Sequence, residues 1–101
     1  MRKASKKEII QKLAEQKPFL KEKYHVKKVG IFGSVARGDY NKKSDVDILV
    51  EFSPNASVGF IEFIRLEYFL KKILKRKVDL ATKRALKKAI KNDVLKETIY
   101  V

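Results

Sequence analysis

Alternation between apolar and polar residues marks three short extended segments of the chain. From Asp45 to Phe52, apolar residues recur at every second position, which predicts a strand with one fully apolar face. The β-branched run Val26–Phe32 and the shorter run Lys77–Ala81 are predicted as two further strands. The three segments together predict a small β-sheet.

Helical spacing of apolar residues predicts the rest of the secondary structure, beginning with a helix before the first strand. Ser5 and Glu8 form a capping box, so this helix is expected to begin near Lys6 and to end around His25. Pro18 lies inside the segment and is expected to kink or restart the helix, because proline removes one backbone hydrogen bond.

The second half of the chain is predicted to be mainly helical. A broad apolar stripe predicts a helix over Gly59–Lys75, and residues Lys83–Thr98 predict one or two basic amphipathic helices before an Ile99–Val101 tail. The stripe could pack in the core or, together with the tail, form an interface, and core packing is favoured. The order of elements predicts one α/β (α+β) domain over residues 1–101, with a small mixed sheet packed against helices.

The charge of the chain is strongly positive. Its 101 residues include 25 lysines and arginines against 12 aspartates and glutamates, a formal net charge of +13. Such a surface attracts polyanions, including nucleotides, nucleic acid or an acidic protein. A lysine-rich surface is also typical of thermophile proteins, and this alternative explains the charge equally well.

Cysteine is absent from the sequence, which excludes disulfides and thiolate metal sites. No apolar run approaches the length of a membrane span, and the N-terminus lacks the apolar core of a signal peptide. We therefore expect a cytoplasmic protein without membrane contact.

Two carboxylates stand in the predicted strand that begins near residue 45. Asp45 and Asp47 are two positions apart, so they project to the same side of the strand, with Cβ atoms roughly 7 Å apart. Two carboxylates so close repel each other unless a cation or a shared proton lies between them, and Mg²⁺ is commonly held by one or two carboxylates together with substrate phosphates. A chance D-x-D pair is common, so the pair gains weight only from its context.

A glycine turn precedes the pair and supplies that context. Gly33 permits close backbone approach, Ser34 adds a hydroxyl, and the exposed amides of the turn can receive phosphate oxygens. Arg37 is spaced to reach back over the turn with a fork of donors. The alternative is an ordinary turn with a solvated arginine.

Asp79 provides a third carboxylate, between two aliphatic residues of the short strand Lys77–Ala81. An unpaired acid facing the core is costly, so its side chain is expected to face solvent or a site. If its strand lies beside the Asp45 strand, three carboxylates converge, which is enough for two metal ions.

The sequence Gly33-Ser34, ten residues, then Asp45-Val46-Asp47 resembles the signature of the DNA polymerase β-like nucleotidyltransferase superfamily. Arg37, Ser44 and Asp79 extend the resemblance, and the short length resembles the minimal, MntA antitoxin-type branch. The resemblance implies the polymerase β-like fold and transfer of AMP from ATP to a hydroxyl.

The resemblance also implies roles for individual residues. Asp45 and Asp47 would ligate Mg²⁺, and Asp79 would join them around a second ion and act as general base or ligand. The nucleotide-binding residues would be those of the glycine turn and the loop before the strand: Gly33, Ser34, Arg37 and Ser44.

A partner is implied as well. Minimal members often pair with a HEPN-domain toxin, and some adenylylate a tyrosine of that toxin, so we expect a HEPN-type partner and an oligomer of one or two kinds of chain. Two alternatives remain at this point. The protein could be a non-catalytic antitoxin that masks its partner, or an RNA-associated module whose affinity falls steeply with salt.

Overall fold

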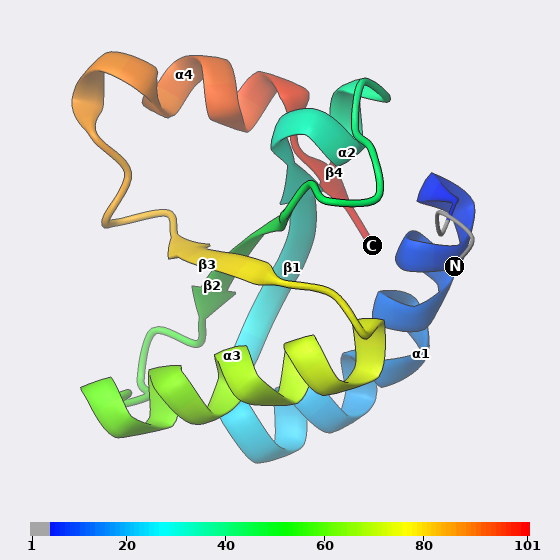
Figure 1. Ribbon diagram of the computed structural model, residues 1–101. Helices are drawn as coiled ribbons and strands as arrows, with labels where there is room; N and C mark the ends of the chain where they lie inside the picture. The colour runs from blue at the N-terminus through cyan, green and yellow to red at the C-terminus, as the bar shows by residue number, and fades with distance from the viewer. Residues whose placement is uncertain (1–4) are drawn as a thin grey trace.

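The computed structural model describes residues 5–101, which form four helices and four strands around one sheet (Figure 1). In chain order the elements are α1 (Lys6–Tyr24), β1 (Val26–Phe32), α2 (Gly33–Arg37), β2 (Val46–Phe52), α3 (Phe60–Leu74), β3 (Val78–Thr82), α4 (Lys88–Glu97) and β4 (Ile99–Tyr100). The predicted α/β architecture with a small mixed sheet is confirmed.

The strands lie in the order β3-β2-β1-β4. β1 pairs antiparallel with both β2 and β4, whereas β2 and β3 are parallel. The parallel pair requires a crossover, and α3 supplies it. Asp79, on β3, is therefore placed on the strand next to the one that carries Asp47.

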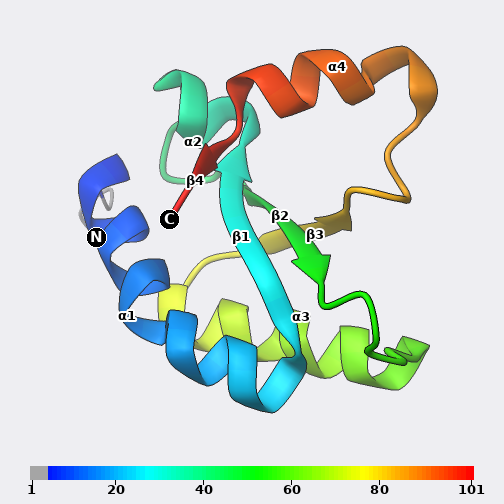
Figure 2. The same cartoon turned by 180° about the vertical axis from the view of Figure 1, so that it is seen from behind.

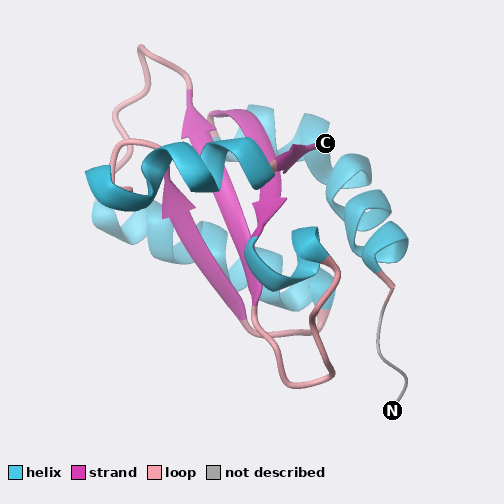
Figure 3. Cartoon of the chain, turned by 90° about the horizontal axis from the view of Figure 1, so that it is seen from above, coloured by secondary structure: helices cyan, strands magenta, loops and turns pink. Residues whose placement is uncertain are grey.

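Helices cover the two faces of the sheet unequally. Figures 1 and 2 show α1 and α3 packed along one face, and Figure 3, viewed from above, shows α2 and α4 on the other side. The main core lies between the sheet and the α1–α3 pair. Its fully buried side chains include Ile9, Leu13, Leu20, Val29, Ile31, Val46, Ile48, Val50, Leu66 and Leu70.

The first helix begins and ends where the sequence predicted, and Pro18 lies inside it without restarting it. Ser5 caps the helix by accepting a hydrogen bond from the Glu8 amide at 3.1 Å, and α1 runs without interruption to Tyr24. Leu13 and Leu20 are fully buried on either side of Pro18. Their burial in one core outweighs the single backbone hydrogen bond that proline removes.

Two elements were not predicted. The glycine turn is a short helix, α2, so Arg37 is helical rather than part of the following loop. The Ile99–Val101 tail contributes β4, which pairs with Gly30 and Ile31 of β1. A Cβ atom at Gly30 would lie 2.8 Å from the carbonyl oxygen of Ile99, so only glycine allows this edge strand to approach.

The basic C-terminal segment forms a single helix, α4, and the apolar stripe of α3 is divided between core and solvent. Leu66, Leu70 and Leu74 are buried, as core packing requires. Phe60, predicted as part of the stripe, is 78% exposed because it lies at the first turn of the helix, beyond the end of the sheet. None of the helices within residues 5–101 is long and apolar enough to cross a membrane.

Candidate active site

Asp47 and Asp79 are direct partners in the parallel pairing of β2 and β3. Side chains at paired positions of neighbouring strands point to the same face of a sheet, here the face away from α1 and α3. Asp45 immediately precedes β2 and shares this direction, because it is two positions from Asp47. The strand order thus places the three carboxylates on one side of the sheet.

The electrostatics of Asp47 reflect this crowding. The pKa of Asp47 is raised from 3.8 to about 6, mainly by partial burial and then by the charges of Asp79 and Asp45. Arg37 opposes the shift and Glu97 adds to it. Asp47 is therefore the member of the cluster whose charge most needs a compensating cation.

Gly33 lies directly against the Asp47 carboxylate. Its φ of 70° is in the left-handed region, and a Cβ atom added there would collide with Asp47 Oδ2. Glycine is thus required on two counts, conformation and space. It lets the backbone that begins α2 approach the carboxylates on β2.

Arg37 reaches back toward the turn, as the sequence predicted, and contacts two acids there. Its Nε lies 3.3 Å from Asp39 Oδ2, and its Nη1 lies 3.3 Å from Glu97 Oε2. Glu97 also accepts a hydrogen bond from the Gly33 amide at 2.9 Å. Sequence reasoning missed Glu97, because nothing local indicates that the end of α4 lies beside a turn 64 residues earlier.

The two predicted serines have different surroundings. Ser34 lies in α2, half-buried, and its carbonyl accepts from the Gly38 and Asp39 amides. The Ser44 hydroxyl accepts from the Asn41 amide at 3.0 Å and so closes the loop before β2. The predicted contact of Ser44 with nucleotide therefore remains a prediction.

Arg76 is a second residue that the sequence did not single out. Its Nη2 donates to the carbonyl oxygens of Asn41 and Ser44, at 2.8 and 2.7 Å. These bonds tie the end of α3 to the loop that leads into Asp45. Arg76 thereby holds the loop that positions Asp45, although Arg76 itself is not part of the carboxylate cluster.

The donor set suits a hard divalent cation such as Mg²⁺, which takes oxygen ligands. Within residues 5–101, however, no three acidic, histidine or cysteine side chains are gathered closely enough to enclose a metal ion unaided. A cation at the Asp45–Asp47 pair would need further oxygens from water or from substrate phosphates, which is the usual arrangement for Mg²⁺.

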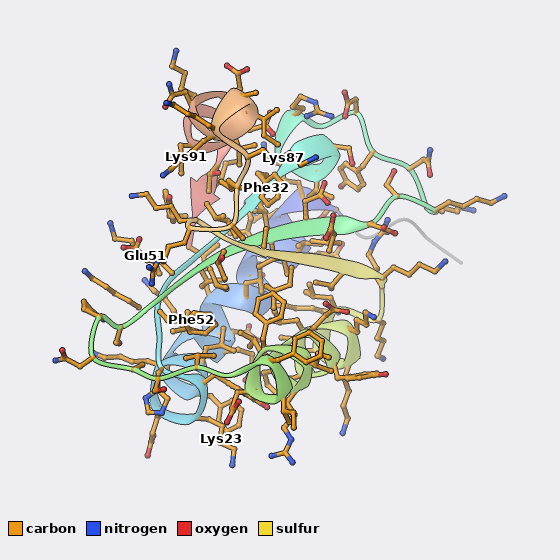
Figure 4. All side chains as sticks on the ribbon, turned by 90° about the vertical axis from the view of Figure 1, so that its left-hand side faces the viewer. Lys23, Phe32, Glu51, Phe52, Lys87 and Lys91 are labelled. Carbon is orange, nitrogen blue, oxygen red and sulfur yellow. The ribbon has the colours of Figure 1, made fainter. Side chains whose placement is uncertain are left out.

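Positive charge lines the same side of the molecule. Figure 4 shows Lys87 and Lys91 at α4, on the side of the sheet that α1 and α3 leave open. Lysines placed there attract an anionic ligand toward the carboxylate cluster without fixing its geometry. A separate hollow of about 790 Å³ lies at the other ends of β2 and β3, between Phe52 and Arg84.

Comparison with a family model and comparison with curated proteins agree. A family model described as a nucleotidyltransferase domain matches residues 13–101. Protein adenylyltransferase MntA of Thermococcus cleftensis is 43% identical over 94 residues, which cover 93% of this chain and 93% of that protein. The matched region includes every candidate site residue.

Solved structures give the same result for the fold. A structure described as a minimal nucleotidyltransferase superposes with a TM-score of 0.78 at 28% identity, covering 98% of both chains. A complex from Shewanella oneidensis, a tri-AMPylated HEPN toxin with an MNT antitoxin, contains a chain that superposes with a TM-score of 0.57 at 21% identity. That likeness covers 94% of this chain and 66% of the other, and at this identity it concerns the fold alone.

Proposed function

The chain belongs to the nucleotidyltransferase family, in its minimal MntA-type branch, and from this premise we propose that it transfers AMP from ATP to a tyrosine hydroxyl of a HEPN-type toxin, for which it is the antitoxin. The observation that carries the chemistry is the pairing of Asp47 with Asp79 across β2 and β3, beside the Gly33 turn. The protein partner is taken from the names of the similar proteins, and the tyrosine acceptor from the resemblance to the minimal branch.

The carboxylates divide into two roles in this proposal. Asp45 and Asp47 hold Mg²⁺, which, when bound, neutralises charge on the phosphate oxygens of the substrate. Asp79 lies on the neighbouring strand at the register of Asp47 and is exposed. Its position suits a carboxylate that accepts the proton of the acceptor hydroxyl or joins the others around a second ion.

The transfer itself is a displacement at the α-phosphorus. The acceptor oxygen forms a bond to that phosphorus, the bond to the bridging oxygen breaks, and pyrophosphate leaves. The hydroxyl proton passes to Asp79. Positioning and charge neutralisation provide most of the rate enhancement in such reactions, so the protein needs few groups beyond these.

The triphosphate is bound by the donors around the glycine turn. The Gly33 amide and the Arg37 guanidinium both contact Glu97, and Ser34 follows Gly33 at the start of α2. The guanidinium is the charged donor of this group, and charged donors make stronger hydrogen bonds to phosphate than neutral ones. Lys87 and Lys91 add diffuse attraction from α4.

The direct test is transfer of label from α-³²P-ATP with Mg²⁺, with a native lysate and a purified HEPN-type toxin as acceptors. We expect a labelled protein band with the wild type, none with Asp45→Asn, and an unchanged band with Asp93→Asn. Asp93→Asn removes one acid from the exposed side of α4 and so controls for the change in charge. Label on RNA alone would mean that RNA, and not the toxin, is the acceptor. No label in any fraction would favour the non-catalytic antitoxin.

A further inference from the structure

Glu97 occupies the donors that the nucleotide would need. Its Oε1 accepts from the Gly33 amide at 2.9 Å, and its Oε2 lies 3.3 Å from Arg37 Nη1. One carboxylate thus bridges the backbone amide and the guanidinium of the glycine turn. In charge and in spacing, it stands where two oxygens of a phosphate group would stand.

Glu97 and a triphosphate cannot accept from the Gly33 amide at the same time. The Gly33 amide has one hydrogen, and Glu97 already receives it in good geometry. Glu97 also brings a negative charge to the carboxylate cluster, where it contributes to the raised pKa of Asp47. A triphosphate arriving at this turn therefore meets both a filled donor and an additional repelling charge.

The position of Glu97 is unfavourable for the helix that carries it. It is the last residue of α4, where the partial negative charge of the helix C-terminus disfavours an acid. The backbone on both sides is held. Thr98 donates from its amide and its hydroxyl to the Val94 carbonyl, and Ile99 pairs with Ile31 of β1. Release of the donors thus requires only rotation of the Glu97 side chain, which is 27% exposed.

We propose that Glu97 is an internal competitor of the triphosphate. It holds the Gly33 amide and Arg37 in place while the site is empty and must rotate away for nucleotide to bind. This inference rests on the proposed function, since it assigns the same donors to the same substrate. While Glu97 holds these donors, the protein binds no triphosphate. The apparent affinity for triphosphate is therefore the intrinsic affinity multiplied by the fraction of molecules in which Glu97 is released.

The test is nucleotide affinity rather than turnover. Binding of α,β-methylene-ATP with Mg²⁺, and separately of inorganic tripolyphosphate, is measured by calorimetry for wild type, Glu97→Gln, Glu97→Ala and Asp93→Asn. Glu97→Ala frees both donors, and we expect its dissociation constants to fall by about three- to tenfold, as for a competent fraction of about a tenth to a third. Glu97→Gln keeps an acceptor for the Gly33 amide but loses the charge, so its gain should be smaller.

Asp93→Asn is the matched control, because it removes the same charge from the same helix while leaving the Gly33 and Arg37 contacts intact. An equal gain for Asp93→Asn would mean that net charge is the cause and would overturn the inference. So would unchanged or weaker binding by both Glu97 variants, because Glu97 would then support the donors rather than compete for them. Glu97→Gln preserves the size of the side chain and decides the question if Glu97→Ala loses its helix content. Failure of wild type and all variants to bind either ligand would instead overturn the proposed function, and this inference with it.

Discussion

Asp47 and Asp79 occupy paired positions on two parallel strands, so two acids share one register of the sheet while Asp45 lies two residues away. In the nucleotide-free protein this arrangement opposes folding, because burial and like charge both disfavour the ionised Asp47. A fold selected for stability alone would not gather these residues. Their proximity is a cost that a bound cation would relieve, as the proposed function requires.

The first prediction follows from the raised pKa of Asp47. The folded state binds its proton below about pH 6, whereas the unfolded state releases it near 3.8. Between these values the folded state holds more protons, so stability falls as the pH rises through this window and the loss is complete above pH 6. Asp47→Asn should therefore stabilise the metal-free protein at pH 7.5, on the order of 1 kcal/mol after allowance for solvent screening.

Urea unfolding in EDTA at pH 4 and pH 7.5 measures this difference. The advantage of Asp47→Asn should be present at pH 7.5 and should largely disappear at pH 4, where the wild-type carboxyl is protonated in the folded state. Asp93→Asn, on the exposed side of α4, should show little difference at either pH. Equal stability of wild type and Asp47→Asn at pH 7.5 would contradict the raised pKa.

The second prediction concerns the close approach of Gly33 to Asp47. Gly33→Ala should destabilise the protein by about 2–4 kcal/mol and abolish transfer, because the new methyl group meets a carboxylate at a positive φ. Gly38→Ala is the matched control. Gly38 has a φ of 90°, but a Cβ there would meet no atom within 4 Å, so backbone strain alone should cost about 1 kcal/mol.

Thermal unfolding and transfer assays compare the two glycine variants. Gly38→Ala should retain most of its activity, since its open surroundings leave the carboxylates in place. If both variants lost stability and activity to the same extent, backbone strain would explain the requirement for glycine and the contact with Asp47 would not.

Sequence reasoning predicted the candidate site residues that stand in local patterns, the Asp45–Asp47 pair and the glycine turn. Asp45, Asp47 and Gly33 carry their chemistry in local spacing, so a period-two pattern and a turn were sufficient to predict them. The role of Asp79 depended on strand order, which the sequence left conditional and β2–β3 pairing resolved. For the three aspartates, the geometry of β-strands was what made the prediction possible.

The features that sequence reasoning missed depend on contacts between distant segments. β4 has only two residues, and its pairing exists because Gly30 lacks a side chain where the Ile99 carbonyl approaches. That pairing in turn brings Glu97 to the turn at Gly33. A single carboxylate at the end of a basic helix carries no periodic signal, although its unfavourable position at the helix C-terminus is a signal that could have been used.

The third prediction concerns cooperation between metal and nucleotide. Because no enclosed three-ligand cluster exists within residues 5–101, Mg²⁺ alone should raise the melting temperature little. Mg²⁺ with α,β-methylene-ATP should raise it by more than the sum of the two separate effects, since the phosphate oxygens complete the ligand set. EDTA should remove the combined effect, and Asp45→Asn should lack it. A large shift with Mg²⁺ alone would show instead that the carboxylates bind the ion without substrate.

The last prediction concerns Arg76, which acts on the site without touching it. Its two bonds to the Asn41 and Ser44 carbonyls hold the loop that ends at Asp45. Arg76→Ala should cost about 1–2 kcal/mol of stability, because these carbonyls lose charged donors. It should also lower the rate of transfer about tenfold, since a carboxylate displaced by a fraction of an ångström no longer meets the phosphate correctly.

Lys77→Ala is the control for Arg76→Ala, because Lys77 is an exposed cation one residue away whose removal changes the net charge equally. Single-turnover rates at saturating nucleotide separate a positioning effect from weaker binding, and chemical denaturation gives the stability of each variant. A positioning role predicts a lower rate with a nearly unchanged nucleotide dissociation constant. If Arg76→Ala lost affinity but kept its rate, Arg76 would be better understood as part of the electrostatic attraction for the triphosphate, and the position of Asp45 would have to be maintained by β2 alone.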